Sequence, residues 1–269
     1  MTPVSRESAK EATAKAAMQL VRENDTLAVG SGSTVDIMIK ALAEKFEGPH
    51  KPRIVAASRQ SESLLKKYGF PLTPLEEIES FRIMLDGADE VAPDLSLIKG
   101  GGGAHLREKL LAKMSKQLVI MVDYSKLVKR LGEKTLLPLE VVPFALPYVG
   151  RELDKRGLEP TLRHVHEEER NTPFVTDNGN NIIDCRLSKE PDDPTELDQS
   201  LKSIVGVVET GLFVGMASQI FIGMPDGRVE EFHPHQGRKN ARLPSVLGEA
   251  LMDHMTRSKR LVPDASSKS

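Results

Sequence analysis

The stretch TLAVGSGST, at residues 26–34, joins a short apolar run to a Gly/Ser turn and decides the fold of the first half of the chain. Residues 26–30 are typical of a buried strand, and a helical pattern over about 35–46 follows the turn. The same alternation continues with apolar runs at 53–57, 81–85 and 117–122 and with helical patterns at 61–68 and 104–116. Strands separated by helices are typical of βαβ units, so we predict an α/β fold whose parallel sheet is covered on both faces.

The pattern changes near residue 132, where a strand at 140–144 and a helix at 147–156 are predicted. Farther on, Asn178-Gly179 favours a two-residue hairpin turn, because both turn residues need positive φ. We read this middle block as a small α+β domain inserted before the C-terminal strands. The predicted boundaries are 1–131 plus 205–235 for a large domain, 132–204 for the small domain and 236–269 for a C-terminal extension. In that extension a short helix is predicted from the apolar residues Val246, Leu247, Leu251 and Met255.

Composition limits the classes of function that the chain can have. The 269 residues carry a formal net charge of -2, which excludes a broad basic surface for nucleic acid or anionic membranes but permits a local basic pocket. The one cysteine, Cys185, cannot form an intrachain disulfide and fits a reducing compartment. No apolar run approaches the ~18–20 residues of a membrane span, and the first twenty residues predict an amphipathic helix. We therefore expect a cytoplasmic protein with no nucleic-acid and no membrane partner.

The turn Gly30-Ser-Gly-Ser-Thr34 is the first segment that could carry chemistry. Its glycines allow a close approach of the backbone, and the free N–H groups at a helix start, with the hydroxyls, suit an anion such as phosphate. The segment has neither a complete G-x-G-x-x-G fingerprint nor a P-loop lysine. A tight turn with Ser/Thr helix capping explains it equally well.

Three carboxylates within five residues form the second segment, Leu85-Asp-Gly-Ala-Asp-Glu90. It stands at the end of a predicted strand, where open α/β sheets place their ligands. Carboxylates in that position can bind sugar hydroxyls or transfer protons. Taken alone, the segment is better explained as a turn with solvated acids.

The third segment is LIKGGGGAHLREK at residues 97–109. Four consecutive glycines lose so much conformational entropy on folding that we expect them only where a backbone closely surrounds something. In the helix that follows, the predicted core-facing stripe consists of Leu106, Leu110 and Met114. Glu108 falls roughly opposite this stripe, so it faces either solvent, near the favourable helix N-terminus, or a cleft. The glycines favour the cleft, with Lys99 beside it.

Together these motifs closely resemble those of the ribose-5-phosphate isomerases of the A type. The matching pieces are GSGST at 30–34, DGADE at 86–90, LIKGGGG at 97–103, REK at 107–109, PLEVVPF at 138–144, VTDNGNNIID at 175–184 and VGVVETGLF at 205–213. They follow the order of the family over nearly the whole chain up to about residue 231. The VVETGLF stretch is more similar to the eukaryotic branch than to the bacterial one.

The resemblance implies a Rossmann-like domain carrying a smaller α+β domain, and interconversion of D-ribose 5-phosphate and D-ribulose 5-phosphate in the pentose phosphate pathway. It implies no metal and no organic cofactor, a sugar phosphate as the bound small molecule, and a homodimer or homotetramer. Glu108 falls at the position of the proton acceptor. The positions that fall at substrate-binding sites are Ser31, Gly32, Ser33, Thr34, Asp86, Gly87, Ala88, Asp89, Lys99, Gly100, Gly101, Gly102 and Lys126.

The chemistry of the residues agrees with this expectation. An aldose–ketose isomerase moves a proton between C2 and C1 through an enediolate, so it needs a carboxylate base, for which we choose Glu108. We choose Asp86 to move protons on the sugar oxygens, and Lys99 with N–H groups of the glycine loop to stabilise the oxyanion. The 31–34 turn and Lys126 are the candidates for binding the phosphate, and the sequence leaves open which of them binds hydroxyls instead.

Several histidines depart from the family pattern or invite another reading. His105 stands where a small or apolar residue is usual, so it either adds a pH-dependent charge beside the site or points outward. The pairs His164/His166 and His233/His235 each place two rings on one face of a strand, but neither has a third ligand at metal-binding spacing. We therefore expect no metal site, and we expect Cys185 to be a packed thiol.

Other classes of protein remain as alternatives to the isomerase. A non-catalytic sugar-phosphate sensor of the same fold would carry a helix-turn-helix segment and could lose the base, whereas this N-terminal segment is too short for one and Asp86, Lys99 and Glu108 are all present. An acyl-CoA transferase would use Glu108 as a nucleophile and form a covalent CoA ester. A dinucleotide dehydrogenase is disfavoured by the incomplete glycine fingerprint.

Overall fold

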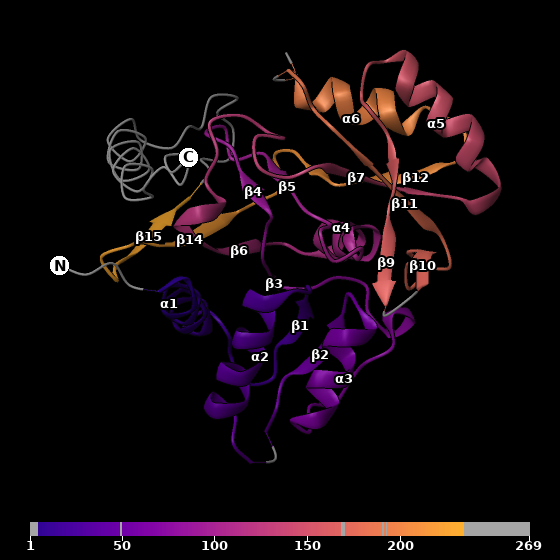
Figure 1. Cartoon of the computed structure of the whole chain (residues 1–269). Coiled ribbons are helices and arrows are strands. Elements are labelled where there is room, and N and C mark those ends of the chain that lie inside the picture. Colours follow the sequence, from indigo (N-terminus) through magenta and orange to yellow (C-terminus); the bar gives the residue numbers. More distant parts are fainter. Residues whose placement is uncertain (1–4, 49, 168–169, 190, 192, 234–269) are drawn as a thin grey trace, which may run out of the picture.

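The structure, a computed structural model, describes residues 5–48, 50–167, 170–189, 191 and 193–233. Its largest sheet (Figure 1) has six strands in the order β15 (Val229–Phe232), β14 (Gln219–Gly223), β6 (Leu118–Asp123), β3 (Ile83–Asp86), β1 (Thr26–Val29) and β2 (Arg53–Ala56). The strands from β14 to β2 pair in parallel, and β15 joins the edge antiparallel. This sheet confirms the α/β class that the alternation of strands and helices predicts.

The order of the strands reverses between β1 and β3. β1 pairs with β2 on one side and with β3 on the other. The chain therefore goes from β1 to the strand on one side of it and then crosses to the strand on its other side. The N–H of Gly30 donates to the carbonyl of Leu85 at 3.0 Å, and the loops after β1 and β3 therefore begin side by side. In open α/β sheets the crevice beyond such a reversal is the usual place for a ligand.

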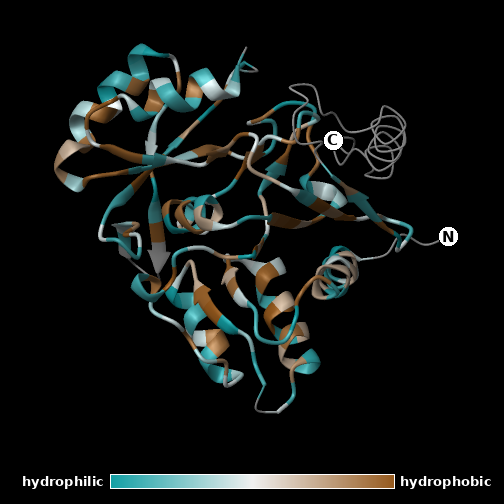
Figure 2. Cartoon of the chain, turned by 180° about the vertical axis from the view of Figure 1, so that it is seen from behind, coloured by the Kyte–Doolittle hydropathy of each residue, from teal (hydrophilic) through white to brown (hydrophobic). Residues whose placement is uncertain are grey.

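Helices cover one face of the large sheet. α1 (Arg6–Met18), α2 (Ser33–Lys45) and α3 (Arg59–Lys67) contribute Ala17, Met38 and Leu65 to a core shared with Leu27 of β1. Ser5 and Ser58 cap α1 and α3 through their side chains, which fixes where these helices begin. Figure 2 shows the apolar strands and inner helix faces in brown, with hydrophilic residues on the outside.

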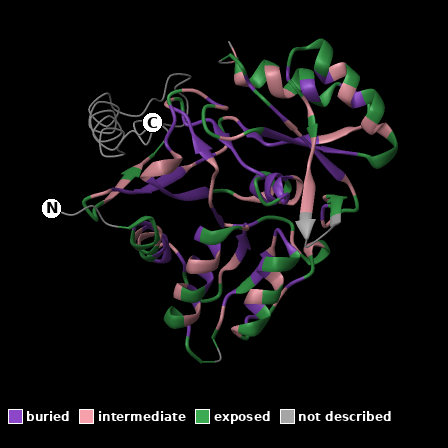
Figure 3. Ribbon diagram, in the orientation of Figure 1, coloured by how far each residue is buried: buried purple, intermediate pink, exposed green. Residues whose placement is uncertain are grey.

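The opposite face is covered by α4 (His105–Met114) and by a three-stranded sheet in the order β13 (Leu212–Phe213), β5 (Leu97–Ile98) and β4 (Glu90–Val91). Leu111 of α4 and Phe213 join Ala28 in this second core. Leu27 and Ala28 belong to different cores because successive side chains of a strand point to opposite faces. α4 therefore lies in the middle of the molecule, as its buried ribbon in Figure 3 shows.

A second unit follows, at the upper right of Figure 1. Its sheet has the order β12 (Val207–Thr210), β7 (Leu137–Val141), β11 (Asn181–Cys185) and β8 (Thr161–Leu162), and a separate ribbon pairs β9 (His164–Glu167) with β10 (Arg170–Pro173). α5 (Leu146–Lys155) and α6 (Pro194–Lys202) bury Val149, Leu153 and Leu201 against this sheet. Three short 3-10 helices complete the described elements: η1 (Leu75–Glu77), η2 (Tyr124–Lys126) and η3 (Pro143–Ala145).

Two local predictions for this unit are wrong in detail. The strand expected at 140–144 is β7, which ends at Val141, and Pro143, which has no N–H for a ladder, begins η3 instead. Asn178-Gly179 does form a tight turn, in which the N–H of Gly179 donates to the carbonyl of Thr176, but of these two residues only Gly179 has positive φ. The strands on either side of the turn do not form the expected hairpin ladder: β10 pairs with β9, and β11 pairs with β7 and β8.

The domain boundaries stay a prediction, although strand pairing differs from them at one point. β12 lies in the four-stranded sheet beside β7, whereas the boundary at residue 205 groups it with the large sheet. An apolar run such as 205–208 does not reveal its pairing partner, and Val205 is in fact exposed. The predicted helix of the extension and His235 lie outside the described residues. Among the residues that the structure describes, no helix is long and apolar enough to cross a membrane.

Candidate active site

The predicted substrate-binding segments meet at the point where the strand order reverses. A cavity of about 80 Å³ is lined by Ser31, Gly32, Ser33, Thr34, Gly87, Ala88, Asp89, Lys99, Gly100, Gly101, Gly102, Glu108 and Lys126. Asp86 ends β3 and lies behind this lining, in contact with Lys99. The structure thus brings together segments that are separated by up to about a hundred residues in the sequence.

Three charged side chains form a buried cluster at the wall of the cavity. The Lys99 ammonium lies 2.9 Å from Asp86 Oδ2 and 3.1 Å from Glu108 Oε2, and it donates to the carbonyl of Gly87 at 2.8 Å. The relative exposures of Asp86, Lys99 and Glu108 are only 0%, 3% and 2%. Ser31, from the turn after β1, donates to Glu108 Oε1 at 2.7 Å. Each oxygen of the Glu108 carboxylate therefore has a fixed neighbour.

Burial and charge together decide the protonation of this centre. Burial, and then the nearby carboxylate of Glu108, raise the pKa of Asp86 to about 7. Burial lowers the pKa of Lys99, but the charges of Asp86 and Glu108 outweigh burial and the pKa is raised overall. Lys99 is therefore a permanent cation, whereas Asp86 exchanges its proton near neutral pH. A group that gains and loses a proton at the working pH is suited to general acid–base catalysis.

The backbone of the glycine loop is held on both sides of Lys99. The N–H of Lys99 donates to the carbonyl of Gly211 at 2.9 Å, and the N–H of Gly101 donates to Asp89 Oδ2 at 2.7 Å. Gly100 has a φ of 100°, which a residue with a Cβ adopts only with strain. The run of glycines therefore wraps the backbone around the cavity, as the sequence predicts.

The other end of the cavity can bind an anion. The N-cap residue before α2 is Gly32, which has no side chain to accept hydrogen bonds from the N–H groups of the first turn. The lining residue Lys126 adds positive charge. Lys10 of α1 donates to Ser33 Oγ at 3.0 Å and brings a second ammonium group to the same turn. Sequence patterns did not identify Lys10, since nothing in the composition of α1 marks one lysine among several.

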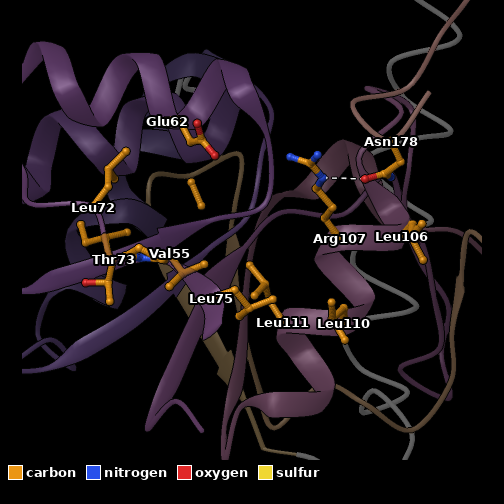
Figure 4. A pocket seen from close by; sticks show the side chains of 13 residues that line it. Val55, Glu62, Leu72, Thr73, Leu75, Leu106, Arg107, Leu110, Leu111 and Asn178 are labelled. Carbon is orange, nitrogen blue, oxygen red and sulfur yellow. Dashed lines mark hydrogen bonds between the residues drawn. The ribbon is translucent and has the colours of Figure 1, made fainter. Parts of the chain in front are cut away.

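α4 is oriented differently from the prediction. Its buried residues are His105, Glu108, Lys109, Leu111 and Ala112. Of the predicted core stripe, Leu110 is 47% exposed, and Leu106 and Leu110 line a separate apolar cavity of about 400 Å³ between α4 and β2. Figure 4 shows this cavity, with Arg107 bonded to Asn178 at its rim. The prediction failed because the inner face of α4 holds ion pairs, which the periodicity of apolar residues cannot reveal.

Lys109 explains why charged residues occupy that inner face. Its ammonium lies 2.8 Å from Glu209 Oε1 and donates to the carbonyl of Thr210 at 2.8 Å, which ties α4 to β12. The Lys99 ammonium lies 5.5 Å from the centroid of the Phe213 ring, and the Lys109 ammonium lies 5.0 Å from the same centroid. Both contacts are within the range of cation–π attraction. One aromatic ring thus links the buried cluster at the wall of the cavity to the Lys109–Glu209 pair.

His105 fits neither of the two roles expected for it. It is fully buried at the start of α4, so it does not point outward, and a Cβ added to Gly100 would lie 2.6 Å from its Nδ1 atom. Burial, and then the charge of Lys109, lower the pKa of His105 to about 3. The ring is therefore neutral across the physiological pH range and serves as packing for the glycine loop.

The remaining candidates lie away from the cavity. His164 Nδ1 is 2.9 Å from the carbonyl of Leu162, and exposed His233 pairs with Glu231. The described residues contain no group of three or more His, Cys, Asp or Glu placed to hold a metal ion. Cys185 is buried, and burial raises the pKa of its thiol to about 12, which leaves it inert.

A buried carboxylate that sequence reasoning missed organises the TDNGN turn. Glu140 Oε1 accepts hydrogen bonds from Thr176 Oγ1, Asn178 Nδ2 and Asn180 Nδ2, at 2.9, 3.0 and 2.9 Å. The neighbouring Asp177 accepts from the N–H of Arg59, at the start of α3, at 2.8 Å. The turn therefore connects the small sheet to α3 and α4, and the repeated Asn and Thr of the motif were its only local signal.

Taken together, a buried carboxylate–lysine–carboxylate centre next to an uncapped helix start at the strand-order reversal defines a sugar-phosphate isomerase that works by proton transfer. The model of the family "Ribose 5-phosphate isomerase A (phosphoriboisomerase A)" matches residues 53–227. The chain belongs to this family. The relatives include ribose-5-phosphate isomerase A 1 of Oceanobacillus iheyensis, which is 44% identical over 81% of this chain and 95% of the relative. Ribose-5-phosphate isomerase A of a Synechococcus strain is 42% identical over 81% of this chain and 94% of its own.

Solved structures agree with the sequence relatives. A D-ribose-5-phosphate isomerase in complex with phospho-erythronic acid superposes with a TM-score of 0.81 at 32% identity, covering 86% of this chain and all of the other. Ribose 5-phosphate isomerase A from Methanocaldococcus jannaschii gives a TM-score of 0.79 at 37% identity, covering 85% of this chain and 100% of the other. These likenesses confirm the predicted Rossmann-like domain with a smaller α+β unit. The similarity to the eukaryotic branch stays a prediction.

Proposed function

We propose that this chain interconverts D-ribose 5-phosphate and D-ribulose 5-phosphate through an enediolate, in the non-oxidative branch of the pentose phosphate pathway, with Glu108 as the base. The family supports the reaction. The observation that carries the assignment of roles is the contact of one buried ammonium, Lys99, with the two carboxylates of Asp86 and Glu108. A cation between two carboxylates places charge stabilisation and proton transfer within reach of the same substrate atoms.

In the forward direction Glu108 removes the proton from C2 of the open-chain aldehyde and returns it to C1. The hydroxyl proton of O2 leaves and O1 gains one, so C1 is reduced, C2 is oxidised and no outside redox partner takes part. Glu108 is suited to this role because Ser31 and Lys99 hold its carboxylate at one place in the cavity, from which it can reach two adjacent carbons.

Asp86 and Lys99 act on the oxygen atoms of the sugar. Asp86, whose pKa burial and Glu108 raise to about 7, gives and takes the protons of the ring oxygen, O1 and O2. Lys99 keeps its charge and stabilises the enediolate oxygen, together with N–H groups of the glycine loop. The uncapped first turn of α2 and Lys126 bind the phosphate, while Asp89, another residue that lines the cavity, binds the sugar hydroxyls.

One experiment separates this proposal from the alternatives. Purified chain is incubated with ribose 5-phosphate, and ketopentose formation is followed with time; catalytic turnover is expected. Binding without turnover would favour a sugar-phosphate sensor and contradict the proposal. A stable CoA ester on Glu108 after incubation with an acyl-CoA would favour a transferase. Phospho-erythronic acid, whose carboxylate resembles the planar anionic end of the enediolate, is expected to inhibit competitively.

Assembly and location are part of the same proposal. We propose a homodimer or homotetramer, supported by apolar side chains that lie exposed near η3: Phe144, at 96%, with Val142, Tyr148 and Val205. A Phe144→Ser variant is expected to shift the mass measured by light scattering toward the monomer; an unchanged mass would assign the interface elsewhere. A cytoplasmic location is proposed as well, and fractionation of cells that express the chain tests it.

A further inference from the structure

A single arginine of the small unit holds the glycine loop of the candidate site. Arg163 stands between β8 and β9, and its Nη1 donates to the carbonyls of Gly100 and Gly101 at 3.0 and 2.9 Å. Both carbonyls belong to the run of glycines that follows Lys99. Two successive peptide units are therefore held by one nitrogen atom.

The guanidinium is itself fixed on its other edge. Nε and Nη2 of Arg163 donate to the two carboxylate oxygens of Asp184 in β11, the former at 2.8 Å. The guanidinium also lies 5.8 Å from the centroid of the Phe174 ring. The side chains of Arg163 and Asp184 are 16% and 15% exposed. A bidentate arginine–carboxylate pair that is mostly buried has one geometry, which a flexible surface pair does not have.

The direction of two carbonyls decides the direction of two N–H groups. In a trans peptide the C=O and the N–H point to opposite sides, and the described chain contains no cis bond. The carbonyls of Gly100 and Gly101 point toward Arg163, so the N–H groups of Gly101 and Gly102 point away from it. The Gly101 N–H does reach Asp89 Oδ2 at 2.7 Å, on the side of the cavity.

Successive N–H groups that point to the same side form a concave site for an anion. In this molecule Asp89 already accepts from the Gly101 N–H, which leaves the Gly102 N–H as the donor for the proposed enediolate in the cavity next to Lys99. Glycine loops are flexible by themselves, because the residues lack side chains and lose much entropy when they are ordered. The Gly103 N–H donates to the Gly100 carbonyl at 2.9 Å within the loop, and Arg163 adds a contact from outside that fixes the Gly100 and Gly101 carbonyls before charge develops.

We propose that Arg163, held by Asp184, is a positioning residue that orients the glycine loop so that the N–H group of Gly102 points toward the enediolate oxygen. It never touches the substrate. The inference rests on the proposed function, and it adds that the small unit takes part in the chemistry through this contact. Arg163 carries no local sequence signal, since it lies outside the motifs that identify the site.

The test compares Arg163→Gln with a matched control, Arg186→Gln. Arg186 directly follows β11, the strand that carries Asp184, and it also pairs with a carboxylate, that of Glu159, at 3.2 Å. Unlike Arg163, it is exposed and does not contact the glycine loop. In folded Arg163→Gln, kcat for ribose 5-phosphate is expected to fall by up to about 10²-fold, because misplacement of catalytic groups by ~1 Å has effects of that size. KM should change less than threefold, and the control should match the wild type.

Binding gives a readout that a merely structural role would not change. The Kd of phospho-erythronic acid, which carries an anion at the position of the enediolate, should rise at least tenfold in Arg163→Gln. The Kd of inorganic phosphate, which needs only the other end of the cavity, should stay within twofold. Asp184→Asn should show the same selective loss to a smaller degree, and Arg163→Lys should restore part of kcat by donating to one carbonyl.

The outcomes separate the two proposals. If wild type and Arg186→Gln turn over substrate and folded Arg163→Gln keeps kcat within twofold and both Kd values, the positioning role is refuted while the proposed function stands. If the wild type has no turnover, the proposed function itself has failed. If Arg163→Gln does not fold, Asp184→Asn decides: equal losses in both Kd values refute the proposal, and a loss confined to phospho-erythronic acid supports it.

Discussion

The carboxylate of Asp86 lies where a side chain at position 30 would have to be: a Cβ added to Gly30 would come within 1.9 Å of Asp86 Oδ1. Gly30 directly follows β1, the strand next to that of Asp86, and its N–H donates to the carbonyl of Leu85, which precedes Asp86. The backbone at Gly30 therefore packs directly against the buried carboxylate of Asp86. Since no other residue lacks a Cβ, the proposed role of Asp86 depends on a glycine that has no chemistry of its own.

Glu108→Gln should fold and bind substrate almost normally but lose turnover. The amide keeps the size of the side chain and the bond from Ser31, yet it cannot accept a proton from carbon. Loss of a general base should lower kcat by about 10²- to 10⁴-fold, or ~3–5 kcal/mol of barrier. Kinetics with ribose 5-phosphate, and exchange of the carbon-bound hydrogen in deuterated water, measure the effect.

The control for this variant is Glu11→Gln, which changes an exposed glutamate of α1. It should retain full activity. If folded Glu108→Gln kept more than about a tenth of wild-type turnover, a loss below ~1.4 kcal/mol, the base would be another group. The role would then pass to Asp86 or Asp89.

Asp86→Asn should change how stability depends on pH. Burial and Glu108 raise the pKa of Asp86 from 3.8 to about 7, so between these values the folded chain binds a proton that the unfolded chain has released. That contribution to the free energy of unfolding is fully present below about pH 4 and is lost as the pH rises toward 7. The Tm of Asp86→Asn, relative to the wild type, should therefore increase across this interval. Parallel Tm curves between pH 4 and 8 would contradict the raised pKa.

Lys126→Ala should weaken binding of the phosphorylated substrate more than it slows the reaction. Hydrogen bonds to charged groups contribute about 1.5–3 kcal/mol, so KM for ribose 5-phosphate should rise about 10- to 100-fold. Lys129→Ala, which removes an exposed lysine three residues away, is the control. Reaction with unphosphorylated ribose should be equally slow in all three proteins. A uniform change for both sugars would place Lys126 at the hydroxyls instead of the phosphate.

Removal of metal ions should leave turnover unchanged. In the proposed mechanism Lys99 supplies the positive charge beside the enediolate, and Glu108 transfers the proton without a bound metal. Rates before and after exhaustive dialysis against a chelator measure the dependence. Loss of activity that one added metal restores would bring the His164/His166 pair back into consideration.

The sequence predicts this site well where its signals are local. A strand, a Gly/Ser turn and a helix appear in order around residues 26–46, and the run of glycines identifies where the backbone encloses a ligand. The spacing of Leu106 and Leu110 gave a wrong prediction of which face of α4 is buried, because that face depends on the elements that pack against the helix. The roles of Arg163 and Lys10 could not be predicted, because each side chain contacts a residue that is distant in sequence. The pairing of β12 with β7 could not be predicted for the same reason.

The orientation of α4 also has a consequence for how the chain folds. Lys109 meets its partner Glu209 across 100 residues, whereas Leu110 of the same helix remains exposed. Leu111 and Ala112 can pack against the large sheet without β12, but the Lys109 ammonium has no Glu209 to pair with until that strand is present. During synthesis, which proceeds from the N-terminus, Lys109 can form its contacts with Glu209 and Thr210 only after β12 has left the ribosome. Such long-range contacts make folding slow, and activity should therefore appear late, after most of the secondary structure has formed.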